Sequence, residues 1–314
     1  MRAAVALTVL PVLAVQAVKI VQSNDDGWAE LYIRSFNDAL NAAGHQVVLS
    51  GPAENKSGST PLCCGIASTH KLTTSGSSDE EPVARKDACE YSSCPANSGP
   101  TGSNSTRPDL NWVNSYPVTA IKYGINTFGP KLWNGAKPEL AVTGPNVGTN
   151  LWVQVPFSGT VGAACYAAHD AGIPAIAFSG ASTGNLAWNT SPVPARSLVY
   201  AELATILVNQ IVDSGKPYLP EDVFLNVNFP KVEGKCTKAS DFKWVLTRIN
   251  PGLLSPPDVE WCGGDRLPTE TEVILGGGCH ISVSIGDASD KTTVNDDRQD
   301  TVLAKLKDIL VCLD

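Results

Sequence analysis

The fold is decided by a stretch near the amino terminus, VKIVQSNDDG at residues 18–27. Its first part, Val18 to Gln22, is apolar enough for a buried strand, and a polar turn with two carboxylates follows at once. Residues 33–43 then place apolar side chains at helical spacing, and Gly44 ends that pattern. An apolar run returns at residues 46–50, so the sequence predicts a strand, a loop, a helix and a second strand.

The same order of elements recurs later in the chain. A strand is expected at residues 140–143, a helix at 159–171 and another strand at 175–179. Strands that alternate with helices in this way form a parallel sheet with helices on both faces. The predicted fold class is therefore α/β, a Rossmann-like three-layer sandwich with a mostly parallel sheet. Alternating residues at 280–285 and a last amphipathic stretch add a carboxyl-terminal β-hairpin and a helix extension.

The first 17 residues differ from the rest of the chain. Arg2 precedes an apolar run that extends to Val15, and small residues suited to cleavage follow it. The run is shorter than the roughly 20 apolar residues of a spanning helix, so a signal peptide is expected at 1–17, with an uncleaved anchor as the alternative. Residues 18–314 are expected to form one domain, with a cysteine-containing insertion at about 60–109.

The chain contains nine cysteines, none of them in the leader. Disulfides persist in oxidising compartments, so this number indicates a secreted, extracellular protein. Cys165 is the candidate for the free thiol because it lies in an Ala-rich predicted helix. Cys89 and Cys94 are near enough in sequence to close a local loop, and the other connections stay open. Among the N-glycosylation sequons, the one at Asn104 is the best acceptor.

Composition limits the partners of the protein. The chain has 314 residues, of which 43% are hydrophobic and 17% charged, enough for a large core. Its net charge of −8 provides no basic surface, so binding of duplex nucleic acid is not expected. A membrane partner is not expected either. A small anionic substrate would need a metal ion or a local cluster of donors. The number of subunits stays open, with a homo-oligomer among the alternatives.

Polar side chains follow two of the predicted strands. Asp25 and Asp26 come directly after the first strand, and Asn146 follows the strand at 140–143. Ligands of parallel sheets bind at the carboxyl ends of strands, so these side chains are expected at one edge of the sheet. Carboxylate and amide oxygens are hard ligands that suit Mg²⁺ or Mn²⁺. The alternative is a structural role, because Asp-Asp-Gly is also common in turns.

Four motifs occur in a fixed order: SNDDG at 23–27, NKSG at 55–58, TGPNVG at 143–148 and SGTVGAA at 158–164. Together they resemble the motifs of the SurE-like family of phosphatases and nucleotidases. The resemblance extends over about residues 18–60 and 109–230 and is weaker toward the carboxyl terminus. It implies the α/β fold and the hydrolysis of phosphomonoesters, typically those of nucleotides.

The resemblance also implies roles for individual residues. One divalent cation, Mg²⁺ or Mn²⁺, would be held by Asp25, Asp26, Ser57 and Asn146. Asp25 and Asp26 are also the expected catalytic residues, with either water or an aspartate as the nucleophile. The phosphate would be bound at the positive end of a helix by Ser158, Gly159 and Thr160. The alternative for this last group is an ordinary helix cap.

The sequence departs from the family after the two aspartates. Residues 28–32, WAELY, replace a stretch that contains Pro and Gly in bacterial members. Trp28 and Tyr32 are expected either to stack on a nucleobase or to pack against the sheet. The expected partner is a small-molecule phosphomonoester. Two other functions stay open, a secreted protein that binds metal or nucleotide without turnover and a nucleoside hydrolase.

Overall fold

The computed structural model describes residues 17–58 and 80–313. Its strands are β1 (Lys19–Ser23), β2 (Gln46–Pro52), β3 (Thr101–Ser103), β4 (Leu110–Val113), β5 (Leu140–Val147), β6 (Ala175–Gly180), β7 (Val223–Phe229), β8 (Lys243–Thr247) and β9 (His280–Asp287). Its α-helices are α1 (Leu31–Ala42), α2 (Pro117–Tyr123), α3 (Gly129–Leu132), α4 (Gly159–Cys165), α5 (Ala195–Asp213), α6 (Glu270–Leu275) and α7 (Asp296–Leu306). Within the described residues, the strands form one sheet in the order β3-β4-β2-β1-β5-β6-β7-β9-β8.

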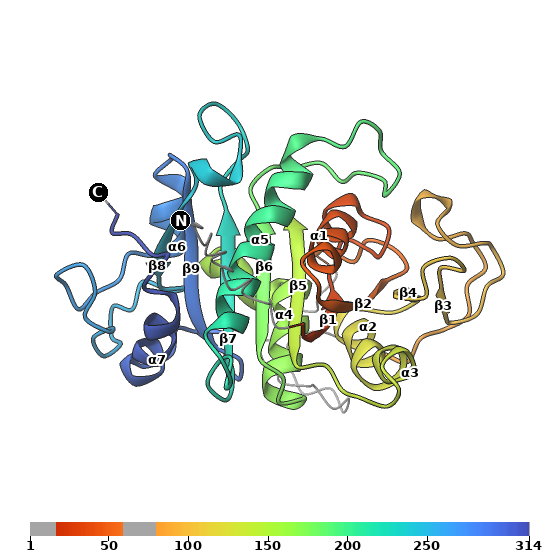
Figure 1. The fold of residues 1–314 in the computed structure, drawn as a ribbon, viewed down its shortest axis with the longest axis horizontal. Helices are drawn as coiled ribbons and strands as arrows, with labels where there is room; N and C mark the ends of the chain where they lie inside the picture. Colours follow the sequence, from red (N-terminus) through yellow and green to blue (C-terminus); the bar gives the residue numbers. More distant parts are fainter. Residues whose placement is uncertain (1–16, 59–79, 314) are drawn as a thin grey trace, which may run out of the picture.

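Parallel pairing dominates this sheet, as the alternation of strands and helices predicts. The neighbours from β4 through β2, β1, β5 and β6 to β7 all run parallel, and β3 and β9 are antiparallel to β4 and β7. Successive residues of a strand point to opposite faces. Ile20 therefore packs with α1 and α5, whereas Val21 packs with α4 on the other face (Figure 1). The predicted three-layer α/β fold is confirmed.

The carboxyl-terminal strands differ from the expected hairpin. β9 is antiparallel to β7, but β8 and β9 form a parallel pair. A parallel pair requires a long crossover instead of a tight turn, and residues 248–279, which include α6, provide it. The expected hairpin is thus replaced by a crossover, and the extension ends with α7. These elements lie at the end of the sheet opposite β3 and β4 (Figure 1).

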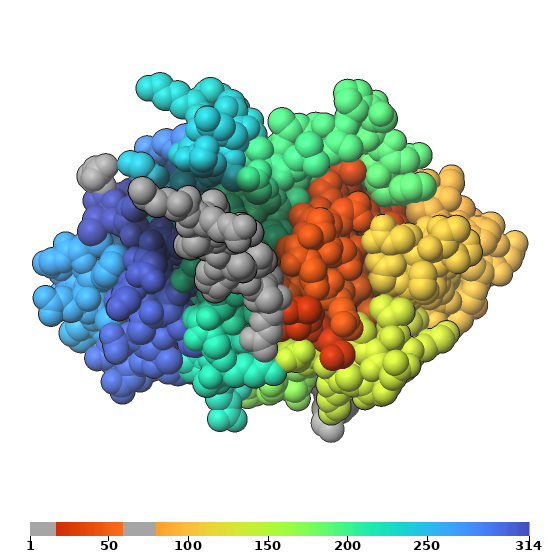
Figure 2. All heavy atoms as spheres, in the orientation of Figure 1, coloured from red at the N-terminus to blue at the C-terminus, as the bar shows by residue number. Residues whose placement is uncertain are grey.

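The described part of the expected insertion, residues 80–109, contributes β3 to the edge of the sheet beside β4. β4 pairs with β2, and β3 pairs with β4. The disulfide between Cys89 and Cys94 packs in one apolar cluster with Trp112 of β4 and with Trp28 and Ile33 beside β1. Figure 2 shows this part, in orange and yellow, at the end of the molecule opposite the blue carboxyl-terminal segments. This segment therefore lies at the β2 side of the sheet, and its disulfide packs against the turn after β1 and against α1.

The cysteine expectations can be compared with the structure where it is described. Cys165 is buried and free, which confirms that prediction. Cys63 and Cys64 lie outside the described residues. The disulfides formed within the described ranges are Cys89–Cys94, Cys236–Cys279 and Cys262–Cys312.

The expected leader, residues 1–17, lies outside the described residues except for Ala17. Among the helices of residues 17–58 and 80–313, none is both long and apolar enough to cross a bilayer.

Candidate active site

A tight turn at the carboxyl end of β1 presents the two aspartates. Asn24 Nδ2 donates to the carbonyl oxygen of Gly27 at 3.0 Å and closes the turn. Gly27 has a φ of 103°, and a side chain there would meet the Glu54 backbone at 3.2 Å. The turn therefore requires glycine at this position. Asp25 and Asp26 are 3% and 2% exposed, so the sequence folds here to bury two adjacent carboxylates.

Asp26 joins three separate segments. Its Oδ2 accepts a hydrogen bond from the backbone amide of Val147, at the end of β5, at 2.8 Å. Its Oδ1 accepts from Asn185 Nδ2 at 3.0 Å and lies 3.4 Å from the Ser57 hydroxyl. The strand ends of β1 and β5 and the loops after β2 and β6 thus meet at one carboxylate.

Asp25 contacts the beginning of α4. Its Oδ1 accepts from the Thr160 hydroxyl at 2.6 Å, and its backbone carbonyl accepts from the amide of Lys56 at 2.7 Å. A Cβ added at Gly159 would lie 2.8 Å from Asp25 Cβ, so only glycine permits this close approach. Ser158 caps the helix, because its hydroxyl accepts from the Val161 amide at 3.1 Å.

The structure therefore brings the three expected phosphate-binding residues to the site and gives each a local contact. The Thr160 hydroxyl and the backbone amides of Gly159 and Thr160 all favour the ionised form of Asp25. Ser158 is the N-cap of α4, which is the alternative role that the sequence predicts for this group. In this arrangement, the start of α4 stabilises the Asp25 carboxylate and lies directly beside it.

Burying several carboxyl groups close together is electrostatically unfavourable for their ionised forms. Burial raises the pKa of Asp25, although hydrogen bonds from Thr160 and Gly159 counteract it. Burial, followed by the negative charge of Asp25, raises the pKa of Asp26 to about 7. Burial, followed by the charge of Asp26, raises the pKa of Glu30 at the start of α1 to about 8. A positive charge in this cluster would offset these effects.

The residues fit a divalent cation. None of the ion pairs between described residues includes Asp25 or Asp26. Asn146 donates from Nδ2 to the Gly148 carbonyl at 2.8 Å, so its Oδ1 is the atom that would ligate a metal. Three buried oxygens at the same strand ends lack a hydrogen-bond partner: Ser23 Oγ, Asn24 Oδ1 and Thr143 Oγ1. Such an all-oxygen environment suits Mg²⁺ or Mn²⁺.

The neutral oxygens are needed for such a site. Among the described residues, no group of three or more His, Cys, Asp and Glu side chains is arranged to hold a metal. A cation at Asp25 and Asp26 would therefore complete its coordination with the Asn146 amide, the Ser57 hydroxyl and water. Ser57 is exposed, so it lies at the rim of the site.

Two residues of the site have no clear signal in the sequence. Asn185 reaches Asp26 from the loop after β6, which reads as an ordinary Ser-, Thr- and Gly-rich turn. Glu30 is fully buried, caps α1 by accepting from the Tyr32 amide, and accepts from the Leu186 amide of the same loop at 3.4 Å. Position after a parallel strand is the one property that could have suggested Asn185.

Trp28 and Tyr32 do not form a pocket wall. They are 1% and 0% exposed, so neither ring can stack on a nucleobase. The Trp28 ring lies 4.6 Å from the Arg34 guanidinium carbon, and the Tyr32 ring packs edge-on against Tyr200 with centroids 5.4 Å apart. The alternative that both aromatic residues pack inside the fold is confirmed, because the hydrophobic gain from burying two large rings dominates.

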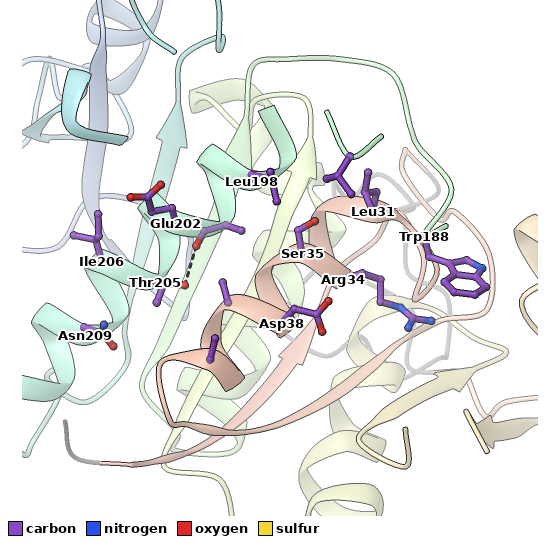
Figure 3. Close-up of a pocket in the computed structure, with 14 residues that line it drawn as sticks. Leu31, Arg34, Ser35, Asp38, Trp188, Leu198, Glu202, Thr205, Ile206 and Asn209 are labelled. Carbon is purple, nitrogen blue, oxygen red and sulfur yellow. Dashed lines mark hydrogen bonds between the residues drawn. The ribbon is translucent and has the colours of Figure 1, made fainter. Parts of the chain in front are cut away.

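A groove of about 610 Å³ lies elsewhere, between α1 and α5 (Figure 3). Its wall includes Ser35 and Asp38 of α1, Leu198 and Ile206 of α5, and Trp188. None of the expected site residues is among the described residues that line it. Since α1 and α5 cover the sheet face opposite α4, this groove is separate from the carboxylate site.

The fold and the site define an α/β protein with a buried pair of carboxylates at the carboxyl edge of a parallel sheet. The family described as "Survival protein SurE" matches residues 20–250. An acid phosphatase of Yarrowia lipolytica (strain CLIB 122 / E 150) is 32% identical over 297 residues, which cover 85% of this chain and 78% of that protein. The chain belongs to the SurE family.

A second relative agrees with this assignment, and a solved structure has the same fold. The 5′-nucleotidase SurE of Nostoc sp. (strain PCC 7120 / SAG 25.82 / UTEX 2576) is 32% identical over 219 residues, covering 69% of this chain and 65% of the relative. The crystal structure of the SurE protein from Aquifex aeolicus superposes with a TM-score of 0.55 and 19% identity, covering 91% of this chain and 98% of that chain. The structural likeness supports the fold.

Proposed function

We propose that this protein is a metal-dependent phosphomonoester hydrolase that acts on nucleoside monophosphates and on other phosphomonoesters. The observation that carries the proposal is the meeting of Asp25 and Asp26 with Ser57, with the strand end that bears Asn146, and with the start of α4. The names of the relatives, acid phosphatase and 5′-nucleotidase, support the same class of reaction.

The cation would be Mg²⁺ or Mn²⁺, held by Asp25, Asp26, Ser57 and Asn146. When bound, such an ion stabilises charge on the phosphoryl oxygens and makes water a better nucleophile. The chain's own groups fix the ligands. Asn185 and the Val147 amide hold the Asp26 carboxylate in place, and the Thr160 hydroxyl holds that of Asp25.

The phosphoryl group would lie between the two aspartates and the start of α4, near Ser158, Gly159 and Thr160. Amides and hydroxyls there stabilise negative charge. Asp25 or Asp26 would orient the attacking water or accept its proton, and direct attack by an aspartate is the alternative route. Either route releases inorganic phosphate and an alcohol.

A product assay tests the proposal. The purified protein is incubated with AMP, GMP, 3′-AMP and p-nitrophenyl phosphate, and released phosphate and released base are quantified. We expect phosphate from all four compounds and no free base, with a preference for nucleotides of less than about a hundredfold over the aryl ester. Release of adenine from AMP would instead indicate a nucleoside hydrolase. Absence of both products would indicate a binding protein.

The protein is further proposed to be secreted. The three disulfides within the described residues support this, because disulfides persist in oxidising compartments. A small-molecule phosphomonoester is the proposed partner.

A further inference from the structure

One segment connects the two halves of the proposed site. Residues 147–158, here called the connecting segment, begin directly after Asn146 and end at Ser158, the cap of α4. Asp26 holds the first residue through the Val147 amide, and Gly159 packs on Asp25 just after the last. Any group displayed along this segment is therefore fixed relative to both aspartates.

The middle of the connecting segment is anchored to the sheet by Asn150. Its backbone amide donates to Asn228 Oδ1 at 2.8 Å, and its Nδ2 donates to Ser179 Oγ at 2.7 Å. Its carbonyl accepts from Asn226 Nδ2 at 2.9 Å. All four side chains are buried, so the segment is held by hydrogen bonds that water does not weaken.

A second anchor holds Trp152. Its backbone amide donates to Glu270 Oε1 at 2.7 Å. The other carboxyl oxygen, Oε2, accepts from Asn226 Nδ2 at 2.8 Å and from Ser284 Oγ at 3.0 Å. Glu270 is fully buried at the start of α6, so it fixes the Trp152 backbone from the side of the sheet.

Trp152 is anchored through its backbone, yet the residue is partly exposed to solvent. It is 46% exposed, and the next residue, Val153, is exposed as well. Trp152 has a φ of 34°, a left-handed backbone conformation that L-residues other than glycine seldom adopt. Such conformations persist where the surrounding structure enforces them, and they concentrate at functional sites. By contrast, four other tryptophans are buried: Trp28, Trp112, Trp133 and Trp244.

The position of Trp152 suits the far end of a nucleotide. Asn146 on β5 is in register with Ser179 on β6, and Ser179 is in register with Asn228 on β7, whose side chain accepts from the Asn150 amide. Neighbouring strands are about 4.8 Å apart, so Asn146 and Asn228 lie roughly 10 Å apart across the sheet. A nucleoside attached to a phosphate at Asp25 and Asp26 can span that separation.

We infer that Trp152 is the platform on which the base of a nucleotide, or the ring of an aryl phosphate, stacks. Glu270 is a positioning residue that holds this platform through the Trp152 amide. The inference rests on the proposed function and names the preferred substrate class, phosphomonoesters of aromatic or nucleoside alcohols. Stacking on an indole face is tolerant of base identity, which agrees with a broad nucleotidase.

The test compares Trp152→Ala and Trp152→Phe with the unaltered protein. Values of kcat/KM are measured for AMP and for glycerol phosphate, which has no ring. For Trp152→Ala we expect kcat/KM for AMP to fall roughly 5- to 150-fold, mainly through KM, and that for glycerol phosphate to change less than about threefold. Trp152→Phe should retain most of the activity on AMP. Equal losses on both substrates, or no loss on either, would overturn the inference.

Trp188→Ala is the matched control, because Trp188 is similarly exposed, at 43%, but lines the groove between α1 and α5. It should leave the ratio of the two kcat/KM values unchanged. Adenosine binding by calorimetry separates this inference from the proposed function. If the protein hydrolyses neither substrate, the proposed function fails, but weaker adenosine binding in Trp152→Ala still supports the platform. Unchanged adenosine binding, or dissociation of an oligomer in that variant alone, overturns it.

Discussion

The molecule buries carboxyl groups at two places, and the difference between them separates a reactive site from a supporting one. Glu270 stands alone, and its two oxygens accept from the Trp152 amide, Asn226 and Ser284. Asp25 and Asp26 are adjacent in sequence, and the charge of the first raises the pKa of the second. Hydrogen bonds compensate a single buried carboxyl group, but a buried pair of like charges calls for a cation.

Burial alone therefore does not mark function. The pKa values of Asp26 and Glu270 are both raised, to about 7 and about 8, with burial as the largest cause in each case. The neighbours differ. At Glu270 the donors come from β7, β9 and the connecting segment, and they tie three elements together. At Asp26 the donors hold the carboxylate at the edge of the sheet, beside the buried oxygens that lack partners.

The largest effect is expected from Asp26→Asn and Asp25→Asn. Each substitution removes a proposed ligand, so kcat should fall by about 10³-fold or more with any phosphomonoester. Above pH 7 and without metal, each variant should be at least as stable as the unaltered protein, because one of two repelling charges is absent. Phosphate-release kinetics and thermal unfolding in EDTA measure the two quantities. An active Asp26→Asn variant, or one that unfolds before it can be assayed, would contradict the distinction between a reactive site at Asp26 and a supporting role for Glu270.

Glu270→Ala should instead act on stability. It leaves the Trp152 amide and Asn226 Nδ2 without an acceptor and opens a cavity, which costs about 2–4 kcal/mol. Glu270→Gln keeps one carbonyl oxygen and the volume, so its loss should be about 1 kcal/mol. Urea unfolding reports both values. Mn²⁺ affinity should be unchanged in Glu270→Gln, and a large drop there would mean that the two carboxyl sites are not independent.

The smallest effect is a dependence on pH. With a raised pKa, Asp26 contributes stability that is fully present below its ordinary value near 3.8 and is lost as pH rises through about 7. The metal-free protein should therefore melt at lower temperature as pH rises from about 4 to 8, with Glu270 acting in the same direction. Metal binding needs the ionised form, so Mn²⁺ affinity should fall up to about tenfold per pH unit below 7. In melting series over this pH range, Asp26→Asn and Glu270→Gln should each lose one component of the pH dependence.

The sequence predicts that Asp25, Asp26 and Asn146 lie close together, because their positions follow from the topology of the sheet. Asp25 and Asp26 come directly after β1, and Asn146 lies near the carboxyl end of β5, which extends beyond the expected residue 143. The carboxyl ends of parallel strands share one edge. The approach of Gly159 to Asp25 has the same origin, since its helix begins after the neighbouring strand. The role of Thr160 as a partner of Asp25 depends on side-chain geometry, which the motif does not contain.

Other features depend on contacts far apart in the sequence. Glu270 is 118 residues from Trp152, and no local pattern links the two. The parallel pairing of β8 with β9 likewise depends on residues 248–279, which connect the two strands. The length of this connection can be read from the sequence, but its path through space cannot. Trp28 and Tyr32 appear beside the aspartates in the sequence, yet burial in the core removes both from the pocket.

The central claim is that hydrolysis depends on a cation held by Asp25 and Asp26. Its most direct test is phosphate release from AMP by the unaltered protein before treatment with EDTA, after it, and after Mn²⁺ or Mg²⁺ is restored. We expect activity to disappear with the chelator and to return with the metal, because neutral side chains alone do not offset the charge on a transferring phosphoryl group. Full activity in excess EDTA would contradict the assignment.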